Sequence, residues 1–504
     1  MEHLLADLRY GARILLKKPG FTLIAIITLA LGIGANTAIF SLVNAALLRP
    51  LPYDHSEQLV MVYSRTKGEA RNAVSWADLR DWQAQSQSFT SLATFVPQSV
   101  NLTGRSEPGR VIGGFVSANF FELLRVNPML GRTFAKGEDE AGAERVALVN
   151  HTVWRDRFGS DPTLIGQTLT LNGQLYTVVG IMPEGFRSPY SEVDIWLPIQ
   201  NHPNFSADRK ATGLGVMGRL KAGVTIEQAQ AEMETIAARL AQEYPETNAD
   251  RSVNILSLQS LLVERIQSNL LILFGAVGFV LLIACANVAN LMLGRAVTRQ
   301  REMALRAALG ATRSRIIRQI LTESLILSLT GGTIGLLIGM WGMDALAMNS
   351  AVNLPPGVTV QFDPYVFAFT FGISILTGAI FGLLPAMRLS RPDLNSTLKE
   401  GSKASGSGTQ GNRVRDALVV AQVAIAMMLL AGAGLMIRTF ANLTGTDPGF
   451  DAKNLLTLEY RVPRNKYPDA RQQWRFHEQV IANIKALPGV KSAAAIFTMP
   501  HGAY

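Results

Sequence analysis

The side chains that could do chemistry are scattered along this 504-residue chain and form no recognisable catalytic or metal-binding motif. The six histidines include no H-E-x-x-H pair, and the sequence contains neither a G-x-x-x-x-G-K-[ST] phosphate loop nor a G-x-S-x-G nucleophile turn. The single cysteine, Cys285, allows no intrachain disulfide and no paired thiolate site. We therefore predict no catalytic residue, no bound metal, no cofactor and no ATPase activity in this chain.

Charged residues outside such motifs have simpler explanations. The acidic run Glu138-Asp139-Glu140 favours a solvated loop, with a cation site as the alternative. The net charge of +9 could suggest nucleic-acid binding, but the basic residues near the apolar segments gather in short loops, as topology-setting charges do. We predict no nucleic-acid partner.

Three polar residues lie within long apolar segments. Asn287 and Asn290 are one helical turn apart, and unpaired amides are costly in hydrocarbon, so we expect them to bond to a neighbouring helix, with gating as the alternative. Glu323 lies about one and a half turns into another apolar segment. An interfacial ion pair with a loop arginine is favoured over a proton relay, because an ionised carboxylate is expensive there.

Glycines in two of the apolar segments recur at four-residue spacing. This spacing places them on one helix face, where small residues let helices approach closely in lipid. The alternative is the general abundance of glycine in membrane helices. The sequence does not decide whether they pack within one subunit or across a dimer. The residues are Gly331, Gly335, Gly339, Gly378 and Gly382.

The elements that position these residues are predicted membrane helices, since each crossing needs about 20 mostly apolar residues. The first, at 21–48, has a basic preceding segment but is too long for a cleaved signal, which favours a retained anchor. The five predicted spans lie at 21–48, 268–293, 317–342, 365–387 and 416–437.

Loop charge predicts the orientation of these spans. The 294–318 loop carries seven arginines against one glutamate, whereas the 344–364 loop has two aspartates and no Lys or Arg. Positive loops mark the cytoplasmic side. The N-terminus is therefore expected inside, with a surface-lying amphipathic helix in 1–20, and the polar region 49–265 outside the cytoplasm.

The region 49–265 is predicted to be an α+β domain, with two subdomains. Gln174–Gly180 alternates as a strand does, and the apolar residues of Val224–Tyr244 recur at helical spacing.

The C-terminal part repeats the layout of the N-terminal part at a period of about 395 residues. A Gly/Ser-rich cytoplasmic linker (389–412) precedes a fifth span within 413–440. A strand-like run (Leu455–Tyr460) and a helix-like run (Ala470–Ala486) follow. We interpret 441–504 as a truncated second extracytoplasmic domain, and expect the native chain to continue beyond Tyr504.

The most specific signal is the run R-Q-R-E-M-A-L-R-A-A-L-G-A at 299–311. It predicts a short amphipathic helix between two spans, with arginines beside an apolar face and a C-terminal glycine cap. Such a helix is suited to docking a cytoplasmic protein; a helix lying on anionic lipid is the alternative. The residues assigned to docking are Arg299, Arg301, Glu302, Met303, Leu305, Arg306 and Gly310.

This run resembles the cytoplasmic signature of MacB/FtsX-type ABC transporter permeases. Four further stretches resemble a duplicated branch of that family, the orphan permeases. They are P-G-F at 19–21 leading to L-G-I-G-A-N-T-A at 31–38, L-R-P-L-P-Y at 48–53, V-S-A-N-F-F at 116–121 and C-A-N-V-A-N at 285–290.

The resemblance implies one span, a MacB-like outer domain, an FtsX-like membrane domain of three spans at 266–388, and a partial second copy of that unit. It further implies a separate ABC ATPase docking in trans at 299–311, and outer domains moved by ATP-driven closure.

The leading functional hypothesis is a multi-pass bacterial inner-membrane permease for export or mechanotransmission, acting on a lipid-like, peptide or antibiotic substrate. The alternative is an FtsX-like regulator that controls an extracytoplasmic partner without transport. Expected partners are membrane lipid, the ATPase, a second copy or pseudo-dimeric half, and a periplasmic adaptor.

Overall fold

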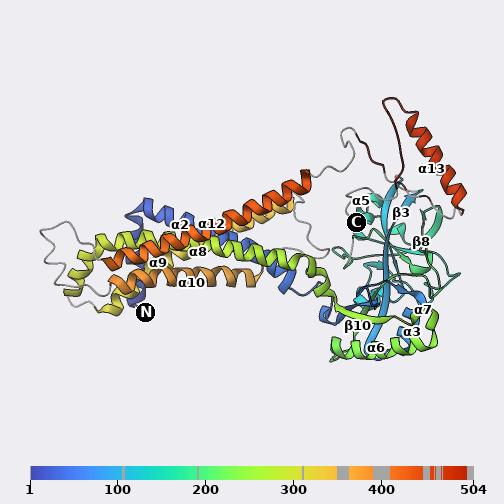
Figure 1. Cartoon of the computed structure of the whole chain (residues 1–504), viewed down its shortest axis with the longest axis horizontal. Helices are drawn as coiled ribbons and strands as arrows, with labels where there is room; N and C mark the ends of the chain where they lie inside the picture. Colours follow the sequence, from blue (N-terminus) through green and yellow to red (C-terminus); the bar gives the residue numbers. More distant parts are fainter. Residues whose placement is uncertain are drawn as a thin grey trace. The chain divides into compact units, whose positions relative to one another are not determined.

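The computed structural model describes residues 2–104, 108–189, 192–308, 312–348, 362–389, 409–445, 455–458, 460, 462, 467 and 469–496. The chain divides into two compact units. We call residues 1–52 and 259–436 the helical unit, and residues 53–258 and 437–504 the sheet unit. Figure 1 shows long helices in the first and a twisted sheet in the second.

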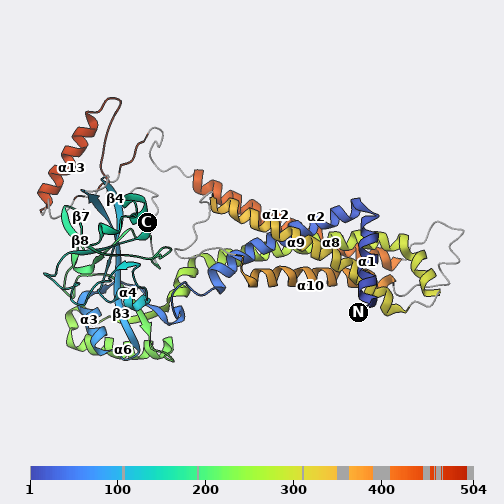
Figure 2. The same ribbon diagram turned by 180° about the vertical axis from the view of Figure 1, so that it is seen from behind.

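The helical unit contains the apolar segments. Within the described residues, five of its helices are long and apolar enough to cross a membrane. Figures 1 and 2 both show α2, α9 and α10 packed side by side. The elements are α1 (Glu2–Leu16), α2 (Pro19–Val43), the π-helical turn η1 (Asn44–Leu48), α8 (Leu258–Ala308), α9 (Arg313–Met348), α10 (Pro364–Leu389) and α12 (Thr409–Gly445).

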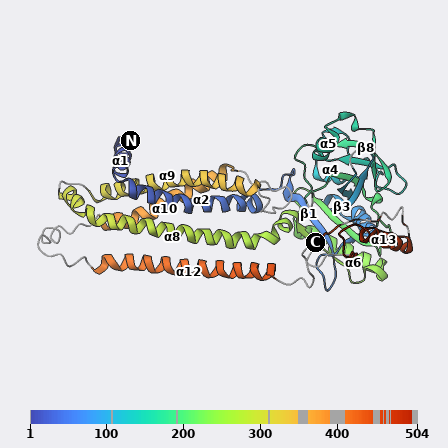
Figure 3. The ribbon, with the colours of Figure 1, turned by 90° about the horizontal axis from the view of Figure 1, so that it is seen from above.

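Helix α8 corrects the prediction of a separate short helix after the second span. It runs without interruption for 51 residues, which Figure 3 shows as one continuous ribbon. Residues 295–308 are mostly Ala, Arg, Leu, Met and Glu, all strong helix formers, so nothing local ends the helix there. The predicted cap, Gly310, lies outside the described residues.

Helix α1 packs against α9, an interaction that the predicted surface-lying helix did not include. Gly11 lies so close to α9 that a Cβ placed on it would be 3.1 Å from Ile326 Cδ1. Asp7 accepts a hydrogen bond from Arg318 Nε at 2.7 Å. Leu8 is 44% exposed, whereas Leu15 is buried.

Two predictions about the C-terminal part are also corrected. Helix α12 begins at Thr409, so the end of the predicted linker is helical. Residues 455–458 form no strand, and Leu456 is 94% exposed. A strand needs a partner for its backbone groups, and none of the described strands pairs with this run. The predicted helix is present as α13 (Ala470–Lys485), whose N-cap Asp469 accepts from Gln472 N–H.

The sheet unit is built on one mixed sheet of eleven strands in the order β11-β1-β10-β3-β4-β9-β6-β8-β5, with β2 paired to β10 and β7 paired to β3 and β8. Its strands are β1 (Leu59–Arg65), β2 (Val74–Ser75), β3 (Phe89–Thr103), β4 (Gly109–Val116), β5 (Leu130–Gly131), β6 (Val146–Val149), β7 (Thr168–Leu171), β8 (Gln174–Ile181), β9 (Ile195–Pro198), β10 (Thr212–Leu220) and β11 (Ser252–Ser257).

Short helices cover this sheet. They are η2 (Ser56–Gln58), α3 (Trp76–Gln85), α4 (Phe120–Leu124), α5 (His151–Phe158), η3 (Pro162–Leu164), η4 (Ile199–Asn201), α6 (Ile226–Glu243) and α7 (Pro245–Asn248).

The long strand β3 joins two separate hydrophobic cores. Its first half pairs with β10 over a core shared with α3 and α6, and its second half pairs with β4 and β7 over a core shared with α5. Local sequence explains two elements. Asn172-Gly173, both with positive φ, form the tight turn between β7 and β8. Thr225 and Gln228 form a capping box that starts α6.

Candidate functional site

The glycines of α9 lie directly against α2. A Cβ at Gly331 would be 2.8 Å from Leu29 Cβ, and a Cβ at Gly335 would be 2.9 Å from Gly34 N. Gly339 has more room, because its Cβ would be 3.4 Å from Gly34 O. At the first two positions any side chain would push the helices apart. We call these three residues and Gly34 the glycine seam.

The glycines of α10 face serines of α9. A Cβ at Gly382 would lie 2.8 Å from Ser324 Oγ, and one at Gly378 would collide with Ser328 Oγ. Both serine side chains are buried, and each donates a hydrogen bond to a carbonyl of its own helix. The predicted packing glycines thus lie at two interfaces, both within one chain.

Two polar residues of α2, to which the sequence analysis gave no role, join this helix to its neighbours. Asn36 Nδ2 donates to Val277 O of α8 at 2.8 Å and to Gly32 O of its own helix at 2.9 Å. The hydroxyls of Thr37 and Thr370 (α10) are 3.0 Å apart. In the sequence, Asn36 and Thr37 are adjacent polar residues inside an apolar span, and this pattern could have indicated their role. Helix α2 is therefore held by α8, α9 and α10 together.

The three intramembrane polar residues singled out from sequence have different surroundings. Asn287 is exposed on α8. Asn290 is half-buried, and its Oδ1 has no hydrogen-bond partner among the described residues. Glu323 is 3% exposed, and its Oε1 accepts from Gln319 Nε2 at 3.2 Å.

The docking residues predicted between 299 and 308 lie on the last turns of α8. They therefore belong to the same helix as the membrane-crossing segment 266–295. A continuous helical backbone joins the two parts, because no loop separates them.

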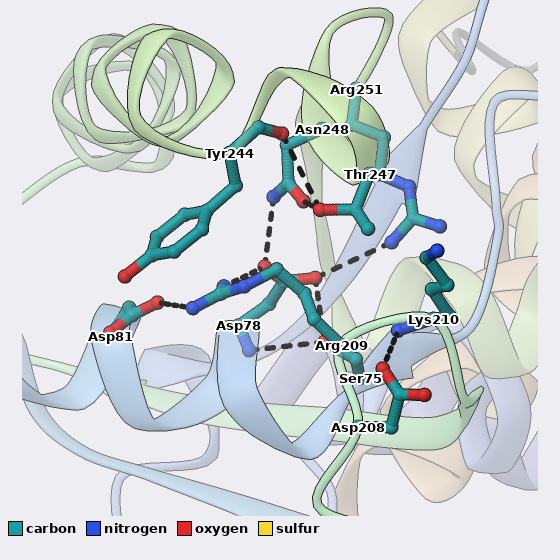
Figure 4. Close-up of polar contacts among 10 residues, drawn as sticks. All are labelled: Ser75, Asp78, Asp81, Asp208, Arg209, Lys210, Tyr244, Thr247, Asn248 and Arg251. Carbon is teal, nitrogen blue, oxygen red and sulfur yellow. Dashed lines mark hydrogen bonds and ion pairs between the residues drawn. The ribbon is translucent and has the colours of Figure 1, made fainter.

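The sheet unit contains a buried polar cluster that sequence reasoning missed (Figure 4). Its centre is Asp78, 3% exposed, in the first turn of α3. Asp78 Oδ1 accepts from Arg209 Nη1 at 2.6 Å and from Asn248 Nδ2 at 2.8 Å. Its Oδ2 accepts from Ser75 Oγ at 2.7 Å and from Arg251 Nη1 at 3.4 Å. This carboxylate joins α3, α7 and the segments before β10 and β11.

Arg209 extends the cluster. Its Nη2 donates to Asp81 Oδ2 at 2.6 Å, and its guanidinium lies 3.8 Å from the centre of the Tyr244 ring. Burial alone lowers the pKa of Arg209, but its hydrogen bonds to Asp81 and Asp78 outweigh burial and raise that pKa above its ordinary value. The arginine is therefore a fixed cation between two carboxylates.

A second buried arginine fixes the segment that precedes β1. Arg219 of β10 is 1% exposed and donates to Leu123 O at 2.7 Å and to His55 O at 3.1 Å. Burial lowers the pKa of Arg219. His55 and Arg125 both have positive φ, and Arg125 Nη1 pairs with Asp54 Oδ2 at 2.5 Å. These contacts hold a strained turn where the chain enters the sheet.

Comparison with known families matches both units. Residues 22–236 match the family described as MacB-like periplasmic core domain, and residues 274–394 match the family described as FtsX-like permease C-terminal. The chain is thus a multi-pass membrane protein with helical spans and an α+β periplasmic domain. More particularly, the two matched regions together resemble a permease of the MacB/FtsX type with a MacB periplasmic core domain.

The chain is also similar to proteins that are named as ATP-binding/permease proteins for export. The chain is 31% identical over 284 residues to "Pyoverdine export ATP-binding/permease protein PvdT" of Pseudomonas syringae pv. tomato, covering 53% of this chain and 39% of that protein. It is 28% identical over 279 residues to "Macrolide export ATP-binding/permease protein MacB" of Marinobacter nauticus, covering 54% and 41%. The chain thus spans less than half the length of these relatives.

Among solved structures, the periplasmic region of MacB from Actinobacillus actinomycetemcomitans aligns at a TM-score of 0.32 and 11% identity, covering 42% of this chain and 94% of that one. The extracellular domain of the noncanonic ABC-type transporter YknZ from Gram-positive bacteria aligns at a TM-score of 0.31 and 13% identity, covering 39% and 99%.

Proposed function

We propose that this chain is the permease subunit of a MacB-like ABC export or mechanotransmission system, in which a separate ATPase moves the periplasmic domain. Its substrate class is lipid-like, peptide or antibiotic, in keeping with the pyoverdine and macrolide export named in its relatives. The N-terminus and the end of α8 lie in the cytoplasm, and the membrane is the bacterial inner membrane. A second copy or pseudo-dimeric half and a periplasmic adaptor complete the proposed assembly.

The observation that carries this proposal is the continuity of α8. Its 51 residues correspond to about 75 Å of helix at 1.5 Å per residue. It begins at Leu258, directly after β11 ends at Ser257. A rod of this length reaches across ~30 Å of hydrocarbon with several turns to spare at each end. A force applied to its cytoplasmic end would therefore be transmitted along a stiff helix to β11.

The strand pairing supports the same mechanism. Strand β11 pairs with β1, with Val60 opposite Ser257, and β1 is the first strand after α2. Two membrane helices thus lead into adjacent strands of one sheet. The buried clusters around Asp78 and Arg219 tie the segments flanking these strands to the rest of the unit. Movement of the helices is then passed to the whole domain.

The last turns of α8 are the proposed docking site for the ATPase. Met303 and Leu305 supply apolar anchors, and Arg306 contributes to a charged rim that steers association. Capture of the ATPase by tagged protein tests this assignment. Met303→Asp and Leu305→Asp each place a carboxylate in a desolvated interface and should reduce capture at least tenfold. Arg306→Glu should weaken capture in a salt-dependent way, and Arg306→Lys, which keeps the charge, is the matched control.

The result separates the two functional hypotheses. Equal capture of an ATPase by wild type and all three variants would show that the end of α8 is not the docking site. Capture of no ATPase by wild type, together with capture of an extracytoplasmic hydrolase, would favour the FtsX-like regulator.

We further propose that α12 and α13 begin a second copy of the first unit, as in the duplicated branch of the family. The sequence of a long apolar helix, α12, followed by a shorter helix, α13, supports this proposal, whereas the strand expected between them is absent from residues 455–458. Helix α13 starts with an aspartate cap, Asp469, that accepts from the N–H three residues on, as Ser75 does at the start of α3. A structure of the native protein with a second periplasmic domain after α12 would support the duplication; a different fold there would exclude it.

A further inference from the structure

The outer end of α2 is not a regular α-helix. The five residues that directly follow α2, Asn44–Leu48, form the π-helical turn η1, in which Arg49 N–H donates to Asn44 O at 2.8 Å, five residues earlier. An α-helix makes this bond four residues earlier. A π turn holds one extra residue, is rare, and is frequently found at functional sites.

Side chains from two other segments hold this turn. Asn44, 5% exposed, donates from Nδ2 to Asp363 Oδ2 at 2.8 Å. The other oxygen of Asp363 accepts from Val366 N–H at 3.1 Å and so caps the first turn of α10. A hydrogen bond to a carboxylate is about twice as strong as one between neutral groups. The wide turn is thereby tied to α10.

The carbonyl groups at the end of the turn are bound by α8. Gln259 Nε2, in the first turn of α8, donates to Leu47 O at 3.3 Å and to Arg49 O at 3.2 Å. Carbonyls at a helix end have no partner within their own helix, so an external donor stabilises the conformation it fits. The side-chain amide of Gln259 therefore stabilises the π form of this turn, because a regular α-turn would place the two carbonyls elsewhere.

We propose that Asn44–Leu48 is a two-state hinge, in which the last turn of α2 converts between the π form and the α form. Asn44 and Gln259 act as positioning residues that favour the π form. Expelling the extra residue rotates the following chain by about 100° and moves it about 1.5 Å along the axis, which together give a Cα displacement of roughly 3.8 Å at a helix radius of about 2.3 Å. The role of the hinge in force transmission rests on the proposed function. The conformational change itself does not.

Fluorine NMR of the chain in lipid nanodiscs tests the hinge. A trifluoroethanethiol label is attached at Leu48→Cys, a position that is 60% exposed, in a Cys285→Ser background. The expected spectrum has one main resonance from the π form. Asn44→Leu and Gln259→Leu should each raise the population ratio of a second resonance tenfold or more. Thr37→Val removes a hydroxyl contact from the same helix but lies in its regular part, and should leave the spectrum unchanged.

A deletion supplies the reference for the second state. Removing Ala46 takes the extra residue out of the turn, so the spectrum should move entirely to the second resonance. If Asn44→Leu fails to fold, Asp363→Asn removes only the charge and should shift the populations in the same direction by less. An unchanged single resonance in folded variants, or an equal change in Thr37→Val, would overturn the hinge. No ATPase is present, so this result is independent of the capture experiment.

Discussion

A close approach between the backbones of two membrane helices gives a quantitative prediction. A Cβ at Gly335 would lie 2.7 Å from Ala30 O and 2.9 Å from Gly34 N. Both atoms are backbone, so no side-chain rotation relieves the contact, and α2 must move away from α9. On the same helix, Gly342 has no neighbouring atom within 4 Å of an added Cβ. Gly335→Ala and Gly342→Ala are therefore a matched pair.

The expected difference follows from two opposing effects. Replacing Gly by Ala within a helix gains up to about 1 kcal/mol of intrinsic helix stability at either site. Overpacking a tight interface costs about 1–3 kcal/mol. Gly342→Ala should thus be neutral or stabilising, whereas Gly335→Ala should be about 1–3 kcal/mol less stable than its control. Gly339→Ala, with 3.4 Å to Gly34 O, should resemble the control.

The assay is thermal unfolding of the detergent-solubilised chain, followed by loss of the monodisperse peak in size-exclusion chromatography. The expected order of midpoints places Gly335→Ala lowest and Gly342→Ala highest. Gly335→Leu should prevent folding altogether. A Gly335→Ala protein as stable as Gly342→Ala would show that α2 and α9 do not pack through this seam.

Three further predictions concern the sheet unit. Asp78→Ala leaves two arginines without their buried carboxylate and should cost about 3–5 kcal/mol in urea unfolding followed by tryptophan fluorescence, whereas Asp81→Ala, at a more exposed site, should cost less. Thr225→Ala removes a capping box and should cost about 1 kcal/mol in the same assay. Burial raises the pKa of Glu138, but hydrogen bonds from Arg132 and a backbone N–H outweigh burial and lower that pKa below its ordinary value. The stabilisation from Glu138 is therefore complete above the unfolded pKa of about 4.3 and is lost as pH falls through the lower folded value, so Arg132→Met should flatten the acid limb of a stability–pH curve.

Much of the fold could be predicted from local sequence patterns. A membrane span needs only a long apolar run, and α6 and β8 are visible from residue periodicity, because each property is written in consecutive residues. The three α9 glycines of the seam were also visible from their spacing. Their partners were not, since Gly34 lies about 300 residues away and the neighbouring helix follows only from the packed structure.

The features that sequence reasoning missed depend on contacts between distant residues. Asp78 meets Arg209 and Arg251 across separations of 131 and 173 residues, and charged residues are too common for such pairs to be recognised. The prediction of a strand at Leu455 was wrong, because alternation of apolar and polar residues shows which face of a strand each side chain would occupy. It does not show whether a neighbouring strand is present to pair with it. The π turn has no local signature in the apolar sequence at 44–48.

Force transmission is tested most directly by measuring the distance between the periplasmic domain and the bilayer during ATP hydrolysis. A donor fluorophore at Leu175→Cys, a position that is 63% exposed, is paired with lipid-linked acceptors in proteoliposomes that contain the chain and its captured ATPase. We predict that energy transfer changes when ATP is added, and that the change is absent with Met303→Asp. Unchanged energy transfer during ongoing ATP hydrolysis by the bound ATPase would contradict the mechanism.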